Sequence, residues 1–220
     1  MAESNKVAKL DFKAKRVKML NAWVNDVKMD DMVEHFNEGV MLTLHVDMMI
    51  KLQKDEAFYN LLPKFDVITC DSQVMYFAAK WLGTPVQERV SGSDYFPKFY
   101  TRYAKDPSIT TFLIGGKEGV ADLASKRINR RTGRTFVVGT YSPPFDFDTS
   151  VTENTRIIEA VNNSGATVCL VGLGGGRQEK WIMENKDKMP SVKLWLPLGG
   201  TIDYARGTFA RPPAWITDWG

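Results

Sequence analysis

The sequence has no apolar run that approaches the roughly 18 residues of a membrane-spanning helix, and its first residues contain no apolar core typical of a signal peptide. It has only two cysteines, Cys70 and Cys169, and neither has a histidine or a second cysteine at the spacing of a metal site. These absences argue against an integral membrane protein, a disulfide scaffold and a cysteine-ligated metal centre. They predict a cytoplasmic protein with two buried free thiols.

The sequence also has little excess charge of one sign. Its 29 Lys and Arg against 26 Asp and Glu give a net charge of +3, and the basic residues are spread out except between Lys6 and Lys18. We therefore expect no nucleic-acid partner. The basic cluster predicts a solvated helix, with a helix lying on the inner face of the cell membrane as the alternative, and we assign residues 1–38 to a basic N-terminal helical segment.

From residue 39 onward, strand-like apolar runs alternate with helical patterns. This alternation predicts parallel strands joined by right-handed crossovers. We expect one α/β domain over residues 39–220, with a mostly parallel, doubly wound, Rossmann-like sheet of about six strands and flanking helices. The expected strands are residues 39–44, 65–70, 110–114, 135–139, 166–173 and 192–198.

Four glycines in five positions, 172–176, separate an apolar run from a helical pattern that starts near Gln178. Such a strand–turn–helix junction presents backbone N–H groups and the positive end of a helix dipole to an anionic ligand. The candidate ligand-binding residues here are Gly174, Gly175, Gly176, Arg177, Gln178 and Glu179. A turn without a ligand is the alternative. Nicotinamide binding is disfavoured, because Arg177 stands where the dinucleotide fingerprint requires its third glycine.

Polar residues also follow the first two expected strands. In open α/β sheets, ligands bind at the carboxyl ends of the strands, so these side chains are candidates for a site. They are Thr43 and His45 after the first strand, Asp71 and Ser72 after the second, and Arg89 and Asp94 in the loop that follows. The alternatives are helix capping for Thr43, Asp71 and Asp94, packing or solvation for His45, and a surface charge for Arg89.

Two later segments are less specific. Asp146 and Asp148 form a D-x-D pair, an arrangement that many metal-dependent glycosyltransferases use to hold a divalent ion, although helix caps give the same pattern. The segment 199–215, which contains Asp203, is rich in glycine, arginine and aromatic residues. We expect it to be a loop that closes over the site, with a proline-stiffened surface connection as the alternative.

Taken together, six segments resemble the WecG/TagA/CpsF glycosyltransferases, bacterial enzymes that attach a sugar, typically N-acetylmannosamine, to an undecaprenyl-diphosphate-linked acceptor. The resemblance runs from about Gly39 to Gly220. The segments are Thr43-Leu44-His45, Thr69-Cys70-Asp71-Ser72, Glu88-Arg89-Val90-Ser91-Gly92-Ser93-Asp94, Phe112-Leu113-Ile114-Gly115-Gly116, Gly172-Leu173-Gly174 with Gln178-Glu179-Lys180-Trp181, and Arg211-Pro212-Pro213-Ala214-Trp215.

This resemblance implies that Asp71 is the general base, and that Thr43, Arg89 and Gln178 line the donor and catalytic pocket. It also implies an inverting, metal-independent transferase without a cofactor. The expected donor is a UDP-sugar, such as UDP-N-acetylmannosamine or a related hexose. The expected acceptor is a polyprenyl-diphosphate-linked saccharide in bacterial surface polysaccharide synthesis. A peripheral membrane contact and a homo-oligomer are both compatible with the sequence.

The chain departs from the family pattern at several positions. His45 replaces an asparagine, Ser72 replaces a glycine, and Gly176-Arg177 replace a proline-lysine pair. Family members usually continue past the tryptophan into a basic helical tail, whereas this chain stops at Gly220. The alternative to an enzyme is therefore a nucleotide-sugar-binding protein without catalysis.

Overall fold

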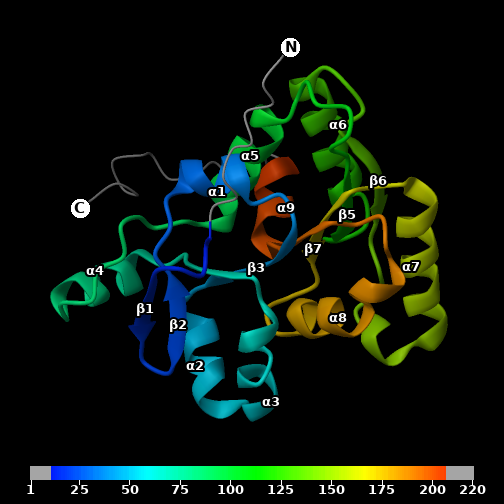
Figure 1. The fold of residues 1–220 in the computed structure, drawn as a ribbon. Helices are drawn as coiled ribbons and strands as arrows, with labels where there is room; N and C mark the ends of the chain where they lie inside the picture. Colours follow the sequence, from blue (N-terminus) through cyan, green and yellow to red (C-terminus); the bar gives the residue numbers. More distant parts are fainter. Residues whose placement is uncertain (1–10, 207–220) are drawn as a thin grey trace.

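A six-stranded sheet forms the centre of the computed structural model, which describes residues 11–206 (Figure 1). Every neighbouring pair of its strands is parallel, in the order β4-β3-β8-β7-β5-β6. The predicted α/β, doubly wound sheet is thus confirmed. The strands are β3 (Gly39–Leu44), β4 (Val67–Cys70), β5 (Thr111–Gly115), β6 (Val137–Tyr141), β7 (Val168–Gly172) and β8 (Leu194–Pro197).

Side chains that alternate along each strand build a separate hydrophobic core on each face of the sheet. In β7, Cys169 and Val171 enter one core, whereas Val168 and Leu170 enter the other. The first core is covered by α2 (Val46–Lys54), α3 (Glu56–Tyr59), α7 (Val151–Ser164) and α8 (Arg177–Asn185). The second is covered by α1 (Met29–His35), α5 (Gly92–Arg102), α6 (Val120–Thr132) and α9 (Gly199–Arg206).

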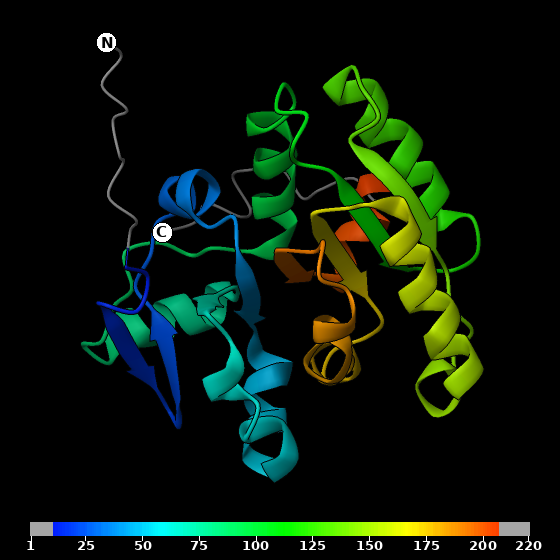
Figure 2. The ribbon, with the colours of Figure 1, turned by 45° about the vertical axis from the view of Figure 1, so that its right-hand side comes forward.

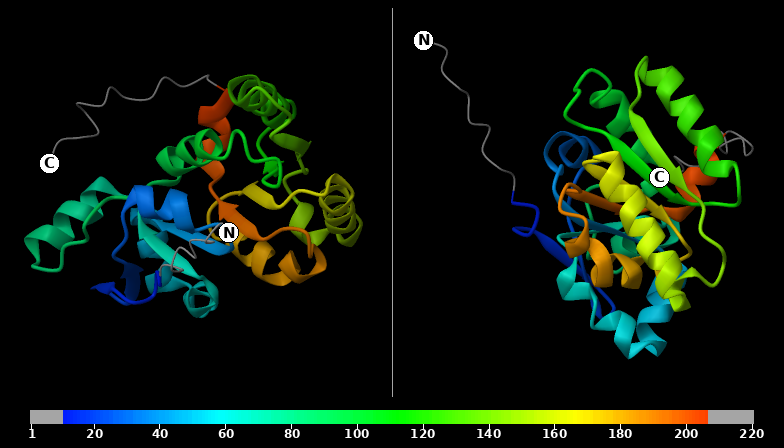
Figure 3. Two further views of the ribbon diagram at one scale, coloured as in Figure 1. Left: turned by 45° about the horizontal axis from the view of Figure 1, so that its top comes forward. Right: turned by 90° about the vertical axis from the view of Figure 1, so that its right-hand side faces the viewer.

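Short 3-10 turns complete several connections, namely η1 (Leu62–Lys64), η2 (Phe147–Thr149) and η3 (Lys186–Lys188). Helix α4 (Gln73–Trp81) differs from the others because it projects from the body of the protein (Figures 1 and 3). It follows β4 directly, at the edge of the sheet farthest from β6.

The N-terminal prediction of a basic helix is wrong for the part that the structure describes. Strands β1 (Arg16–Met19) and β2 (Ala22–Asn25) form an antiparallel hairpin, which lies beside α2 and α3, across the molecule from α6 and α7 (Figure 2). The physical reason is that Met19, Ala22 and Val24 bury their side chains in the first core. Arg16 and Lys18, which alternate with Val17 and Met19 along β1, face solvent, so the period is that of a strand.

Two further boundaries differ from the sequence prediction. Helix α5 begins at Gly92 and is capped by Ser91, whose hydroxyl accepts the Asp94 N–H, so the capping alternative for Asp94 is wrong. Residues 199–206, predicted as part of a loop, form α9, whose Ile202 is buried in the second core.

Both cysteines are buried free thiols, as predicted. Burial raises the pKa of Cys70 to about 11, so this thiol stays protonated at neutral pH. No helix within residues 11–206 is long and apolar enough to span a membrane.

Candidate functional site

Asp71 is the first residue after β4, at the carboxyl edge of the sheet. Its backbone N–H donates to the Leu44 carbonyl at the end of β3 (2.9 Å), which fixes where the side chain starts. Its carboxylate accepts the Gly92 N–H at the start of α5 (3.3 Å) and the Thr43 hydroxyl. Donors from β3 and α5 therefore hold this carboxylate, while a quarter of the side chain (25%) stays accessible to solvent.

The N-cap interpretation of Asp71 is wrong. Ser72 caps α4 instead, since its hydroxyl oxygen accepts the Met75 N–H (3.3 Å). Ser72 was predicted to contact substrate, and the structure gives it this structural bond. Because the neighbour performs the capping, the Asp71 carboxylate is left to face the cluster around it.

The segment that carries Arg89 runs along the outer edge of β4. Val90 donates its N–H to the Cys70 carbonyl and accepts the Thr69 hydroxyl on its own carbonyl, both at 2.9 Å. This pairing places the Arg89 guanidinium over Asp71, with an Nη1–Oδ1 distance of 3.9 Å. The guanidinium also donates to the Asp71 carbonyl (3.3 Å) and to the Asp94 carboxylate (3.2 Å).

Residues upstream of β3 hold this segment in place. The buried Asp26 carboxylate accepts the Gln87 N–H (2.6 Å), and Glu88 accepts the Met29 N–H (2.8 Å). Asn25 bonds the Ile68 N–H of β4 (2.7 Å) and so fixes the hairpin against the same strand. The position of Arg89 therefore depends on the hairpin as well as on β4.

Burial raises the pKa of Asp71 above its ordinary value. The Gly92 N–H, the Arg89 guanidinium, the Thr43 hydroxyl and the charge of His45 all act in the opposite direction, but desolvation is the largest effect. A carboxylate with a raised pKa is a stronger base than one in water. A carboxylate in this setting can accept a proton, and the role of Asp71 as the general base stays a prediction.

His45 lies at the N-cap position of α2, with its side chain half-buried and making no capping hydrogen bond. His45 follows Leu44, whose carbonyl accepts the Asp71 N–H, so the two residues occupy neighbouring positions at the sheet edge. The structure therefore brings together five predicted site residues at the ends of β3 and β4, namely Thr43, His45, Asp71, Arg89 and Asp94.

The glycine turn after β7 is organised differently. The carboxylate of Glu179 caps α8 by accepting the Gly176 N–H (2.5 Å), and it also accepts the Gln178 amide (2.8 Å). Gln178 in turn accepts the Leu173 N–H (3.2 Å) and donates to the Pro197 carbonyl (3.1 Å). Two N–H groups of the turn, predicted to be available to a phosphate, are thus bonded by side chains of the following helix.

Arg177 is also bonded within the protein. Its guanidinium makes two hydrogen bonds to Asp148 (2.8 and 2.9 Å) and lies over the rings of Phe145 and Phe147. The D-x-D segment therefore supplies a partner for Arg177. Ligand binding by Arg177, Gln178 and Glu179, and by the exposed Gly174 and Gly175, stays a prediction.

Glycine is required at position 176. Its φ is +87°, and a Cβ there would lie 2.4 Å from the Cε of Lys51 in α2. Lys51 contacts the turn from the side and pairs with Asp55 (3.0 Å). Gly176 accordingly turns the chain at a φ that other residues rarely adopt, beside the flexible end of Lys51.

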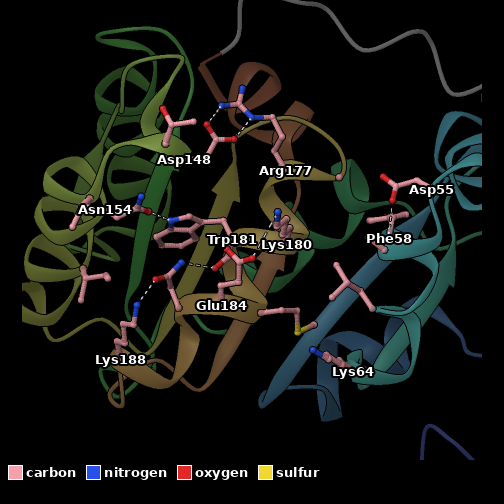
Figure 4. A pocket seen from close by; sticks show the side chains of 18 of the residues that line it. Asp55, Phe58, Lys64, Asp148, Asn154, Arg177, Lys180, Trp181, Glu184 and Lys188 are labelled. Atoms are coloured by element: carbon pink, nitrogen blue, oxygen red, sulfur yellow. Dashed lines mark hydrogen bonds and ion pairs between the residues drawn. The ribbon is translucent and has the colours of Figure 1, made fainter.

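A groove of about 920 Å³ opens beside this turn, between α2–α3 and α7–α8 (Figure 4). Gly176 and Arg177 line it, and the Trp181 indole N–H donates to Asn154 across its wall (2.5 Å). Lysines contribute to both of its sides, namely Lys51, Lys64, Lys180 and Lys188. Neither Asp71 nor Arg89 lines this groove.

The end of β8 connects the two regions. Gly92, which donates to Asp71, approaches Leu198 so closely that a Cβ would lie 2.4 Å from its side chain. The adjacent Pro197 carbonyl accepts the Gln178 amide. Because β3 and β8 separate β4 from β7, three strand spacings put Asp71 and the glycine turn about 14 Å apart. A ligand that touches both must be extended.

The remaining predicted residue, Asp203, is half-buried on α9, and the predicted motif 211–215 lies outside the described residues. Sequence reasoning missed Asp26, Glu88 and Gly92 as supports of the site. Glu88 and Gly92 stand in a motif that was recognised, so proximity to Arg89 was a usable signal. The sequence around Asp26 contained no signal of this role, because its partner Gln87 is 61 residues away.

Comparisons with known proteins bear on this site. A family model described as the glycosyl transferase WecG/TagA/CpsF family matches residues 17–220. The N-acetylglucosaminyldiphosphoundecaprenol N-acetyl-beta-D-mannosaminyltransferase of Bacillus spizizenii is 23% identical over 181 residues, covering 82% of this chain and 67% of that relative. The match begins within β1 and so includes most of the hairpin.

Proposed function

The chain belongs to the WecG/TagA/CpsF glycosyltransferase family, and from that premise we propose that it moves a sugar from a UDP-sugar to a polyprenyl-diphosphate-linked saccharide during bacterial surface polysaccharide synthesis. The Bacillus relative acts, by its name, on an N-acetylglucosaminyl-diphosphoundecaprenol acceptor and transfers N-acetylmannosamine. An N-acetylhexosamine donor and an acceptor of that kind are the first to test.

Asp71 carries the proposal. In the proposed reaction the acceptor hydroxyl oxygen attacks the anomeric carbon of the donor, and Asp71 accepts the hydroxyl proton. The new glycosidic bond forms as the bond from the anomeric carbon to the diphosphate oxygen breaks, and UDP leaves with that electron pair. The raised pKa of Asp71 supports this role, because proton acceptance becomes more favourable as basicity rises.

Arg89 has two roles in this proposal. Its contacts to Asp71 and Asp94 orient the base, and its charge offsets the negative charge that develops on the leaving diphosphate. The donor would extend over the ends of β3 and β8, with its sugar beside Asp71 and its nucleotide toward the glycine turn. The spacing of about 14 Å between β4 and β7 supports an extended ligand of this type.

The test is sugar transfer from a panel of UDP-sugars to a lipid-diphosphate-linked N-acetylglucosamine. Asp71→Asn removes the base and should lower kcat about a hundred- to ten-thousand-fold while UDP binding is retained. Asp47→Asn is the matched control, since Asp47 is an exposed carboxylate in the first turn of α2 at the same edge of the sheet. If Asp71→Asn keeps full turnover, Asp71 is not the base. If the wild-type protein binds UDP without transferring any sugar, the chain only binds the nucleotide.

A further inference from the structure

Helix α4 exposes an apolar stripe to solvent. Val74, Phe77 and Trp81 are spaced at i, i+3 and i+7 on one side of the helix, and Leu82 follows at its C-cap. Trp81 is 88% exposed, Val74 69% and Leu82 68%, whereas Phe77 is 37% exposed. Only Ala79 of the helix is buried. Contiguous exposed apolar surface of this kind marks an interaction site.

The inner side of α4 explains why the helix forms without burying this stripe. Met75 and Tyr76 pack against the first core from partly buried positions. Within residues 11–206, no helix or strand covers the outer side, and the helix stands away from the body of the molecule (Figures 1 and 3). The stripe is thus directed outward from the edge of the sheet.

The position of α4 relates this stripe to the active site. Asp71 and the cap Ser72 directly precede the helix, so the catalytic carboxylate lies at its base. We propose that α4 inserts its apolar side chains into the surface of an anionic phospholipid bilayer and thereby brings Asp71 to the lipid-linked acceptor. This inference rests on the proposed function for the nature of the acceptor.

The charges around α4 favour a bilayer. Lys80 is the only charged residue in the helix, so no carboxylate of its own would be brought to an anionic surface. The hairpin lies on the same side of the molecule in Figures 1 and 3 and exposes Arg16 and Lys18 of β1. The exposed Lys13 and Lys15 directly precede it and pair with Asp66 and Asp26. Tryptophan is suited to the boundary between headgroups and acyl chains, because it has an apolar body and a polar N–H. Basic groups beside an apolar helical face are typical of interfacial membrane binding.

The experiment measures sedimentation of the full chain with vesicles of phosphatidylglycerol and phosphatidylcholine, without donor or acceptor. The variant Trp81→Gln/Leu82→Gln should reduce vesicle binding about tenfold or more, because it removes two large apolar side chains from the bilayer. The matched control is Leu123→Gln/Val151→Gln, which removes two exposed apolar side chains from α6 and α7. That control should bind as the wild type does, and unfolding curves should show that both variants fold.

A second measurement locates the contact. Brominated lipids should quench part of the tryptophan fluorescence of the wild type, and Trp81→Phe should bind vesicles normally but show less quenching. Transfer to a water-soluble acceptor analogue should be equal in the wild type and in Trp81→Gln/Leu82→Gln, whereas transfer to the acceptor in vesicles should fall in the variant. If no acceptor is glycosylated but vesicle binding still falls in the variant, the α4 proposal stands and the proposed function fails.

Three outcomes would overturn the proposal. The wild type could fail to bind anionic vesicles, or the α4 variant could bind as strongly as the control variant. In the third, sedimentation in the absence of lipid shows a wild-type dimer that Trp81→Gln/Leu82→Gln converts to a monomer, with vesicle binding unchanged. That result would assign the stripe to a second copy of the chain.

Discussion

Two ends of parallel strands contain predicted ligand-binding residues, and they differ in how their polar groups are used. After β4, Asp71 is held by backbone and side-chain donors but keeps part of its surface open and has a raised pKa. After β7, Gln178 and Glu179 are buried and bonded to each other and to the turn. The first arrangement leaves a reactive group available, whereas the second fixes a backbone conformation.

After Asp71→Asn, the largest expected effect on activity comes from Arg89→Met. Loss of the guanidinium should lower kcat/KM about a hundredfold or more, because charge on the leaving group is no longer offset. It should also raise the pKa of Asp71 further, so the acidic limb of the pH–rate profile moves to higher pH.

Arg89→Lys should recover part of the activity, since the charge is kept and the planar fork is lost. Arg102→Met is the control, because Arg102 makes a similar bidentate pair with Glu34 on the exposed surface (2.6 and 2.7 Å). Equal activity of Arg89→Met and Arg102→Met would remove Arg89 from the site.

Glu179→Gln tests the arrangement after β7. Glu179 accepts hydrogen bonds from the Gly176 N–H and the Gln178 amide, so the NH2 group of a glutamine in its place would face one of these donors. If the Gln178 amide rotates to offer its oxygen instead, its NH2 group faces the Leu173 N–H. Burial raises the pKa of Glu179 as it does that of Asp71, but both Glu179 oxygens are bonded within the protein. One buried group therefore loses its partner, which should lower the free energy of unfolding by about 1–3 kcal/mol in urea denaturation. Glu184→Gln, on the exposed side of α8, should change it by less than about 0.5 kcal/mol. Similar values for the two variants would contradict a supporting role for Glu179.

Asp71→Asn should stabilise the protein while it abolishes transfer. The folded-state pKa of Asp71 is raised, so the folded protein binds this proton more tightly than the unfolded chain does, and stability falls as pH rises from the ordinary aspartate range through the raised pKa. Asparagine carries no charge and avoids this loss, which predicts a higher Tm at neutral pH. The difference should shrink as the pH falls. A variant that is less stable at neutral pH would show that burial is not the dominant effect on Asp71.

The smallest effect is expected for Arg177→Met. Its pair with Asp148 lies at the surface, and such pairs contribute about 0–1 kcal/mol to stability. Asp148→Asn should have a similar effect, because either change breaks the same pair. If Arg177 only supports the segment 145–148, UDP affinity measured by calorimetry should not change in either variant. A tenfold loss of affinity in Arg177→Met alone would give the glycine turn a direct role in donor binding.

Much of the sheet could be predicted from sequence, because each parallel strand is a continuous apolar run followed by a helix with its own period. The hairpin could not, since its strands each have only four residues, and Arg16 and Lys18 make up half of β1. Its burial depends on contact with β4, which is more than 40 residues away in sequence.

Some contacts of the candidate site could also be predicted from sequence, and others could not. The proximity of Asp71 and Arg89 was implied by the family resemblance, and the structure supplies the reason in the bond between Val90 and Cys70. The partner of Arg177 was not predictable, because Asp148 is 29 residues away and its segment fitted a metal site equally well from sequence. Local pattern therefore locates polar residues at the sheet edge, but it does not say which of them are already bonded.

The bonds from Asp26 to Gln87 and from Met29 to Glu88 have a practical consequence for anyone who shortens this protein. A chain that starts at Gly39 would keep every strand of the central sheet and every residue that we place beside the substrate. It would still lose the two hydrogen bonds that keep the Arg89 guanidinium over Asp71. We expect such a shortened enzyme to retain its sheet but to transfer sugar slowly, because Arg89 is no longer held in one position over Asp71.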